Sequence, residues 1–266
     1  MSDTDSQAAP LAFGLIVIGD EVLNGTRSDG HFPALRERLL ARGHQLAWYW
    51  MLPDDPPTIV RHLRQSFAVA PAQPGTKPTP VFCCGGIGAT PDDHTRACAA
   101  TAAEVPLVPH PEARTIIEER FGAEAYPHRI LMAELPEGST LIPNPVTRVP
   151  GFQIHQHWFL PGFPSMAWPM VDWVLDTHYA PTTGAQTIPL TEQAVEVVGV
   201  AESRLIPLMH DLGAEFPALK LFSLPHMGED PCIRLGFRGR GTLDAAMQAL
   251  CERLTAEQIH YRAPRF

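Results

Sequence analysis

The residues with the most obvious chemical potential form a glycine-rich segment from Gly85 to Thr95, with the sequence Gly-Gly-Ile-Gly-Ala-Thr-Pro-Asp-Asp-His-Thr. Glycines allow a tight turn and let a ligand approach the backbone closely. A helix expected to begin near Asp92 would point its free amides and its positive dipole end into that turn. The segment is neither a Walker A loop nor a Gly-x-Gly-x-x-Gly turn. It favours a phosphate-binding loop of another kind, and a glycine turn with an ordinary aspartate cap is the alternative.

Polar motifs follow four predicted strands at the points where those strands end. The carboxyl ends of parallel strands meet at one edge of an open sheet, which is where ligands bind. We therefore expect the four motifs to lie together. They are Gly19-Asp20-Glu21, Pro53-Asp54-Asp55, Gly85-Gly86-Ile87-Gly88 and Pro161-Gly162-Phe163-Pro164.

The carboxylates in these motifs favour a bridging cation, because they would repel a bare phosphate. A helix terminus contributes about 0.3–2 kcal/mol, whereas a micromolar ligand needs about −8 kcal/mol. Asp20, Glu21 and Asp93 therefore predict a Mg²⁺ site, with Asp93 and Asp20 as candidate catalytic residues. The expected contacts to the phosphate and the rest of the ligand are Gly85, Gly86, Gly88, Thr90, Asp92, Thr95, Gly162 and Pro164.

The order of the elements predicts an α/β fold with a doubly wound, mostly parallel sheet. Short apolar runs typical of buried strands alternate with segments whose apolar residues have helical spacing. A Pro-, Gly- and Thr-rich stretch at 71–80 is interpreted as a surface loop, because the alternation resumes after it. The predicted strands cover residues 13–18, 46–52, 81–84 and 152–160, the last as a strand or hairpin arm, and the predicted helices cover 32–40, 59–67, 112–121 and 165–175.

A length of 266 residues suits two domains. We expect a polar, disordered tail over 1–10, an α/β domain over 11–180 and a small α+β domain over 186–266, with the boundary at Pro-Thr-Thr-Gly-Ala, 181–185. In the second domain, strands are predicted at 194–198, 219–223 and 232–237, and helices at 203–212 and 243–254.

Composition argues against several classes of protein. A formal net charge of −9 disfavours a general nucleic-acid or anionic-membrane binder, because such surfaces are basic. The five cysteines include no C-x-x-C pair, which gives neither a zinc signature nor a disulfide framework. No apolar signal segment or membrane-spanning run occurs, so a soluble cytoplasmic protein is expected.

Two aromatic and histidine patterns receive structural interpretations. His155 and His157 are expected on one face of a strand, a spacing compatible with a metal. No third ligand is apparent nearby, and a structural or surface role is preferred. The run from Trp48 to Trp50 is interpreted as strand packing.

The motifs resemble the molybdopterin-binding domain of molybdenum-cofactor biosynthesis proteins, and in particular the competence/damage-inducible protein A (CinA) family. A Gly-x-x-Glu-Ser segment, residues 199–203, resembles the start of that family's KH-like α+β module. The resemblance therefore covers nearly the whole chain in the family's order. The other matching stretches are 19–25, Asp29, 53–55, 85–95, 135–138, 144–145, 150–152 and 160–164.

The resemblance implies a doubly wound fold that forms homo-oligomers and binds a molybdopterin or nucleotide phosphate at the Gly85 loop. It also implies Mg²⁺ near Asp20 and Asp93. Relatives use the fold to adenylylate molybdopterin or to cleave pyrophosphate bonds such as that of ADP-ribose. The C-terminal amidase domain of many CinA proteins is not expected here, and neither is deamidation of a pyridine nucleotide.

Departures from the family pattern bear on the choice between binding and catalysis. Met166 stands in the place of the Glu in Leu-Pro-Gly-x-Pro-x-Glu, and Ala89 stands where CinA proteins have Pro. Ligand binding, or a non-catalytic scaffold with a degenerate site, is therefore favoured over a Mg²⁺-dependent nucleotide pyrophosphatase or a nucleotidyltransferase-like activity. A further departure is His31, which replaces the Asn of the family's Asp-x-Asn segment.

A KH-like module also raises the possibility of RNA binding. Residues 236–239 spell Gly-x-x-Gly, which in RNA-binding KH domains clamps the nucleic-acid backbone. Here the motif ends a predicted strand, and the second domain has a slight excess of acidic residues. Nucleic-acid binding is therefore a minor alternative.

Overall fold

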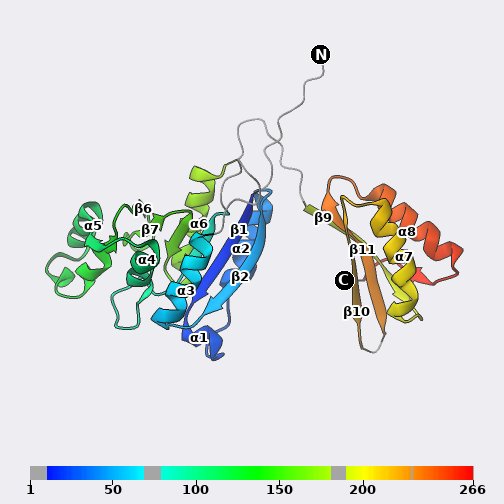
Figure 1. The fold of residues 1–266 in the computed structure, drawn as a ribbon, viewed down its shortest axis with the longest axis horizontal. Coiled ribbons are helices and arrows are strands. Elements are labelled where there is room, and N and C mark those ends of the chain that lie inside the picture. Colours follow the sequence, from blue (N-terminus) through cyan, green and yellow to red (C-terminus); the bar gives the residue numbers. More distant parts are fainter. Residues whose placement is uncertain (1–10, 69–78, 181–189, 229, 266) are drawn as a thin grey trace, which may run out of the picture. The chain divides into compact units, whose positions relative to one another are not determined.

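The computed structural model describes residues 11–68, 79–180, 190–228 and 230–265. The predicted tail at 1–10, most of the predicted loop at 71–80 and the predicted boundary at 181–185 lie outside these ranges. The chain divides into two compact units, residues 1–186 and 187–266 (Figure 1). In the described ranges, no helix has both the length and the apolar character needed to cross a bilayer.

The first unit is built on a six-stranded sheet in which four neighbouring strands run parallel. The last two strands each run antiparallel to their neighbour in the sheet. The prediction of an α/β fold with a mostly parallel central sheet is confirmed. In sheet order the strands are β2 (Gln45–Leu52), β1 (Ala12–Ile18), β3 (Val81–Cys84), β8 (His157–Leu160), β7 (Gly151–Ile154) and β6 (Thr140–Ile142).

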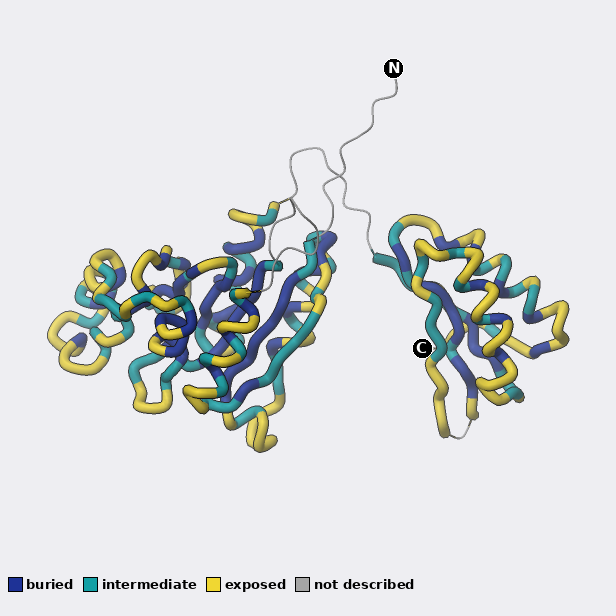
Figure 2. Tube along the Cα trace, in the orientation of Figure 1, coloured by how far each residue is buried: buried dark blue, intermediate teal, exposed yellow. Residues whose placement is uncertain are grey.

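Helices cover both faces of this sheet. Successive side chains of a strand point to opposite faces, so a strand that is apolar throughout needs a covering layer on each side. In β1, Leu15 and Val17 belong to one core cluster and Ile16 and Ile18 to the other. Buried residues follow the strands, and exposed residues lie on the outer sides of the helices (Figure 2). Helices α2 (His31–Ala41) and α6 (Pro164–His178) supply one cluster, and α3 (Pro56–Phe67), α4 (Thr95–Ala103) and α5 (Pro111–Phe121) supply the other.

Short elements complete the first unit. The Gly19-Asp20-Glu21 turn continues into a single helical turn that sequence patterns did not predict. Helix α4 begins at Thr95, three residues after its expected start at Asp92, because residues 91–92 form a turn and 93–94 are irregular. The short elements are α1 (Asp20–Leu23), the 3₁₀ helices η1 (Gly122–Ala125) and η2 (Arg129–Ala133), and the antiparallel pair β4 (Leu107–Pro109) and β5 (Glu134–Pro136).

The second unit has the order β-α-β-β-α-β and an antiparallel sheet in the order β10-β11-β9-β12. This is the split β-α-β arrangement of ferredoxin-like domains. The α+β character agrees with the predicted pattern, whereas the KH-like module is not confirmed. The Gly-x-x-Gly motif lies inside a strand, β11. The elements are β9 (Leu190–Val198), α7 (Glu202–Glu215), β10 (Lys220–His226), β11 (Cys232–Arg240), α8 (Asp244–Ala256) and β12 (Tyr261–Arg262).

The predicted pairing of His155 and His157 on one strand face is wrong. His155 lies in the turn between β7 and β8 with a φ of 52°, and only His157 belongs to a strand. His157 is buried, and its Nε2 lies 2.7 Å from the hydroxyl oxygen of Ser66 on α3. This contact between the sheet and a covering helix supports the structural role.

Acid is expected to destabilise the first unit through His157. Burial, with a smaller contribution from His155, lowers the pKa of His157 to about 3, whereas an unfolded histidine titrates near 6.5. Below pH 6.5 the unfolded chain binds a proton at His157 that the folded chain does not bind. The free energy of unfolding therefore decreases as the pH is lowered. We expect this one group to remove about 2 kcal/mol between pH 6.5 and pH 5. Denaturant unfolding at both pH values measures the loss.

The matched variants for this prediction are His157→Phe and His155→Gln. His157→Phe removes the buried titrating group. Between pH 6.5 and pH 5 its unfolding free energy should therefore fall by about 2 kcal/mol less than that of the wild type. The second changes a histidine of the same hairpin and should keep the wild-type dependence. Equal pH dependence of His157→Phe and the wild type would contradict the assignment.

Candidate functional site

The carboxyl ends of β1, β2, β3 and β8 surround a pocket of about 650 Å³, within the range of small-molecule sites. Residues from all four strand-end motifs line it, as their common location at one sheet edge predicts. The predicted site residues that line the pocket are Glu21, Gly85, Gly86, Gly88, Thr90, Asp92, Asp93 and Gly162. Asp20, Thr95 and Pro164 do not line it.

The glycine loop has a geometry that excludes side chains. Gly85 and Gly86 have φ values of 114° and 66°, a region that favours glycine. A Cβ on Gly85 would lie 2.1 Å from the carbonyl oxygen of Ile18, and one on Gly86 would lie 2.3 Å from Oγ1 of Thr95. Gly85 and Gly86 can therefore carry no side chain, and they line the pocket with backbone atoms alone.

Thr95 lies underneath this loop and is fully buried. Its backbone N–H donates to the carbonyl of Gly86 over 2.9 Å, which connects the first turn of α4 to the loop. Its Oγ1 is buried and has no hydrogen-bond partner among the described residues. Thr95, which the sequence predicts as a ligand contact, therefore packs under the glycine loop and supports it.

Asp93 closes the other end of the loop. Its Oδ2 accepts hydrogen bonds from the backbone N–H of Thr90, over 2.8 Å, and from the Thr90 hydroxyl. A Cβ on Gly88 would come within 2.5 Å of the same oxygen. One Asp93 oxygen therefore shapes the loop, while the residue still lines the pocket.

Asp54 joins the site through a pair of hydrogen bonds with Asp20. The Asp20 N–H donates to Oδ2 of Asp54 over 3.0 Å, and the Asp54 N–H donates to Oδ1 of Asp20 over 3.3 Å. Asp54 lines the pocket and Asp20 does not. Partial burial, followed by the charges of Asp20, Glu21 and Asp92, raises the pKa of Asp54. The sequence identifies the Pro53-Asp54-Asp55 motif, but only the fold shows that Asp54 lines this pocket.

The donor chemistry of the pocket fits Mg²⁺. In the described part of the chain, no three His, Cys, Asp or Glu side chains are grouped as a metal site. Mg²⁺ is commonly held by one or two carboxylates together with substrate phosphates and water, so a complete protein cage is not required. Burial is the main cause of the raised pKa of Asp54, and the charges of Asp20, Glu21 and Asp92 add a smaller repulsion that a divalent cation would relieve.

Arg96 is a site residue that sequence reasoning missed. It is 8% exposed. Its Nη2 donates to the carbonyl of Gly88 over 2.7 Å, and its Nη1 donates to the carbonyls of Glu134, over 3.0 Å, and Leu131. Burial lowers the pKa of this guanidinium. Arg96 therefore joins the glycine loop to the η2–β5 segment, and no motif pattern distinguishes it from a surface arginine.

Apolar residues form the remaining walls of the pocket. One wall contains Phe121, Met132, Val149 and Pro150, and another contains Phe163 and Met166. Asn144, which begins the turn before Val149, accepts hydrogen bonds from the N–H groups of residues 146 and 147 over 3.0 and 3.1 Å. The pocket thus combines a polar backbone loop with surfaces suited to a flat ring.

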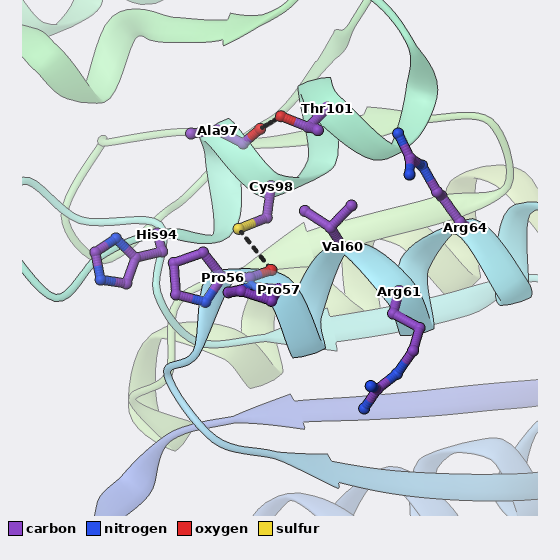
Figure 3. Close-up of a pocket in the computed structure, with 9 residues that line it drawn as sticks. All are labelled: Pro56, Pro57, Val60, Arg61, Arg64, His94, Ala97, Cys98 and Thr101. Atoms are coloured by element: carbon purple, nitrogen blue, oxygen red, sulfur yellow. Dashed lines mark hydrogen bonds between the residues drawn. The ribbon is translucent and has the colours of Figure 1, made fainter.

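A second hollow, of about 670 Å³, lies between α3 and α4 (Figure 3). It contains none of the strand-end motifs, and most of its residues are exposed. Its Cys98 thiol is buried against the carbonyl of Pro56, at 3.8 Å, and burial raises its pKa to about 11. The pocket at the sheet edge is therefore the candidate site. The hollow is lined by Pro56, Pro57, Val60, Arg61, Arg64, His94, Ala97, Cys98 and Thr101.

Residues 14–180 match the family model described as a probable molybdopterin binding domain. The chain belongs to this family. A protein from Pyrobaculum calidifontis is 27% identical over 264 residues, which cover 91% of this chain and 95% of that protein. A CinA-like protein from Citrifermentans bemidjiense is 30% identical over 202 residues, 73% of this chain and 46% of that protein. The chain therefore spans less than half of that CinA-like protein.

The fold also matches a solved member of the CinA group. The structure of CinA from Thermoplasma acidophilum, a protein described as having unknown function, aligns with a TM-score of 0.54 and 25% identity. The alignment covers 62% of this chain and 96% of that one. The resemblance to the molybdopterin-binding domain superfamily, close to CinA, is confirmed.

Proposed function

We propose that this protein binds a phosphorylated pterin or a nucleotide at the sheet-edge pocket, with the phosphate against the loop from Gly85 to Thr90. The observation that carries the proposal is the backbone at the three glycines of this loop, which line the pocket. Contacts with Ile18, Thr95 and Asp93 exclude a Cβ at each of them. Backbone amides at a glycine turn that leads into a helix suit a phosphate.

Carboxylates would act in this site through Mg²⁺. Glu21, Asp54 and Asp93 line the pocket, and Asp20 orients Asp54 through their paired hydrogen bonds. These are the residues that would hold the ion. When bound, Mg²⁺ would neutralise phosphate charge next to the carboxylates.

Calorimetric titration tests binding, with molybdopterin, AMP and ADP-ribose each added in the presence and absence of Mg²⁺. We expect saturable binding of at least one of these compounds, strengthened by Mg²⁺. Asp93→Asn keeps the shape of the side chain but removes its charge, so it should reduce the Mg²⁺ dependence. Absence of binding by all three compounds to the folded protein would refute the proposal.

The second candidate function is hydrolysis of a nucleotide pyrophosphate bond. The observation that favours it is the position of Asp54, which lines the pocket and accepts a hydrogen bond from the Asp20 N–H over 3.0 Å, because a carboxylate held at the site can accept a proton from an attacking water. ADP-ribose hydrolysis with Mg²⁺ tests this candidate, and Asp54→Asn should abolish it. Binding without turnover in the wild type would leave a binding or scaffold role.

A further inference from the structure

The wall of the pocket formed by the β8–α6 turn is apolar, whereas the glycine loop is polar. Phe163 lines the pocket and is 53% exposed, so its ring is accessible there. Met166 lines the same wall from the first turn of α6, and its N–H donates to the carbonyl of Phe163 over 3.0 Å. An aromatic ring beside a polarisable thioether provides a surface on which a flat ring can pack.

Arg27, in the α1–α2 loop, lies over the ring of Phe163. Its guanidinium carbon lies 5.3 Å from the centre of the Phe163 ring, within the distance of a cation–π contact. Its Nη1 also lies 3.4 Å from Oε1 of Glu21, and its backbone N–H donates to the carbonyl of Glu21 over 2.9 Å. Arg27 therefore contacts Glu21 through both its backbone and its half-exposed side chain.

The other apolar wall is less available for stacking. The Phe121 ring already carries two guanidinium groups, with the Cζ atoms of Arg129 and Arg120 at 4.6 and 5.5 Å from its centre. The Phe163 ring carries only Arg27 among the described residues. A ligand ring therefore meets less competition at Phe163.

We infer that Phe163 and Met166 recognise the heterocycle of the ligand by stacking, and that Arg27 is the positioning residue that orients Phe163. This inference rests on the proposed function, because it places the ring of a ligand whose phosphate lies at the glycine loop. It also gives a role to Met166, whose thioether supplies an apolar, polarisable surface in the same wall as the Phe163 ring.

The test compares AMP with ribose 5-phosphate, which keeps the phosphate and the sugar but lacks the base. Both are titrated with Mg²⁺ into the wild type, Phe163→Ala and Phe163→Trp. Because stacking of a base on an aromatic side chain contributes about 1–3 kcal/mol, Phe163→Ala should weaken AMP binding roughly 5- to 150-fold. Ribose 5-phosphate should bind both proteins alike, and Phe163→Trp should restore AMP affinity. Since Phe163 is half exposed, these variants should fold normally.

Two further variants separate the walls and the role of Arg27. Phe121→Ala and Arg27→Gln should each lower the ratio of AMP to ribose 5-phosphate affinity less than Phe163→Ala does. An equal loss of both ligands in Phe163→Ala, or a larger loss of selectivity in Phe121→Ala, would overturn the inference. Saturable binding of ribose 5-phosphate to the wild type would still support the phosphate site. If the wild type binds neither compound, the nucleotide form of the proposed function fails, and the inference fails with it.

Discussion

Replacing Gly86 by alanine is expected to weaken ligand binding by at least about 100-fold, because the glycine loop would lose its shape. An L-residue at a φ of 66° is strained by roughly 1–2 kcal/mol. The new Cβ would also lie 2.3 Å from Oγ1 of Thr95. Since Thr95 is fully buried under the loop, the loop is the part that must move. Two lost hydrogen bonds from amides to a charged phosphate, at about 1.5–3 kcal/mol each, account for the loss.

The matched control for this substitution is Gly138→Ala. Gly138 has a similar φ of 82°, but a Cβ there would meet nothing within 4 Å. It therefore incurs the backbone strain without the collision and lies outside the pocket. Calorimetric titration of both variants with AMP and Mg²⁺ separates the two effects. Unchanged affinity in Gly86→Ala would show that the loop does not contact the ligand.

Replacing Arg96 by methionine is expected to destabilise the first unit by about 3 kcal/mol or more, because three carbonyls lose a charged donor in a buried place. These are the carbonyls of Gly88, Leu131 and Glu134. For a domain of this size the melting temperature should fall by roughly 6–12 °C. Arg96→Lys should recover part of the loss, since an ammonium keeps the charge but not the planar fork.

Arg36→Met is the control, because Arg36 is exposed on α2 and the change should stay within about 0.5 kcal/mol. Differential scanning calorimetry measures all three variants. Where Arg96→Met remains folded, it should also bind AMP less tightly, since the Gly88 carbonyl is no longer held. Equal melting temperatures for the Arg96 and Arg36 variants to methionine would contradict the role assigned to Arg96.

Local sequence patterns were sufficient for the parallel sheet and for most of the pocket. The apolar runs 13–18 and 81–84 are buried, whereas 46–52 is a half-buried strand at the edge of the same sheet. Buried apolar strands have few alternatives to a sheet covered on both faces. Because the polar motifs follow these strands directly, their position at one sheet edge is a consequence of the fold. Eight of the predicted site residues accordingly line one pocket.

Local sequence patterns gave wrong predictions where a short segment can adopt more than one backbone conformation. His155 is followed two residues later by His157, which suggests a continuous strand, yet His155 adopts a positive φ and the chain reverses there. In the second unit, the order of helices and strands was visible in the sequence, but their pairing depends on contacts between distant residues. A β-α-β-β-α-β sheet in the order β10-β11-β9-β12 was therefore not distinguished from a KH-like module.

The sequence by itself determined the α/β class, the glycine loop and the family, because these depend on short motifs and on the period of the apolar residues. Only the tertiary structure decided that Asp54 lines the pocket while Asp20 orients it, and that Thr95 supports the loop from below. Only the fold, likewise, showed that Arg96 is buried and that Arg27 lies over Phe163. The physical reason is that burial and pairing are set by segments far apart in the chain, such as those of Arg96 and Glu134, which are separated by 38 positions. No local pattern encodes such contacts.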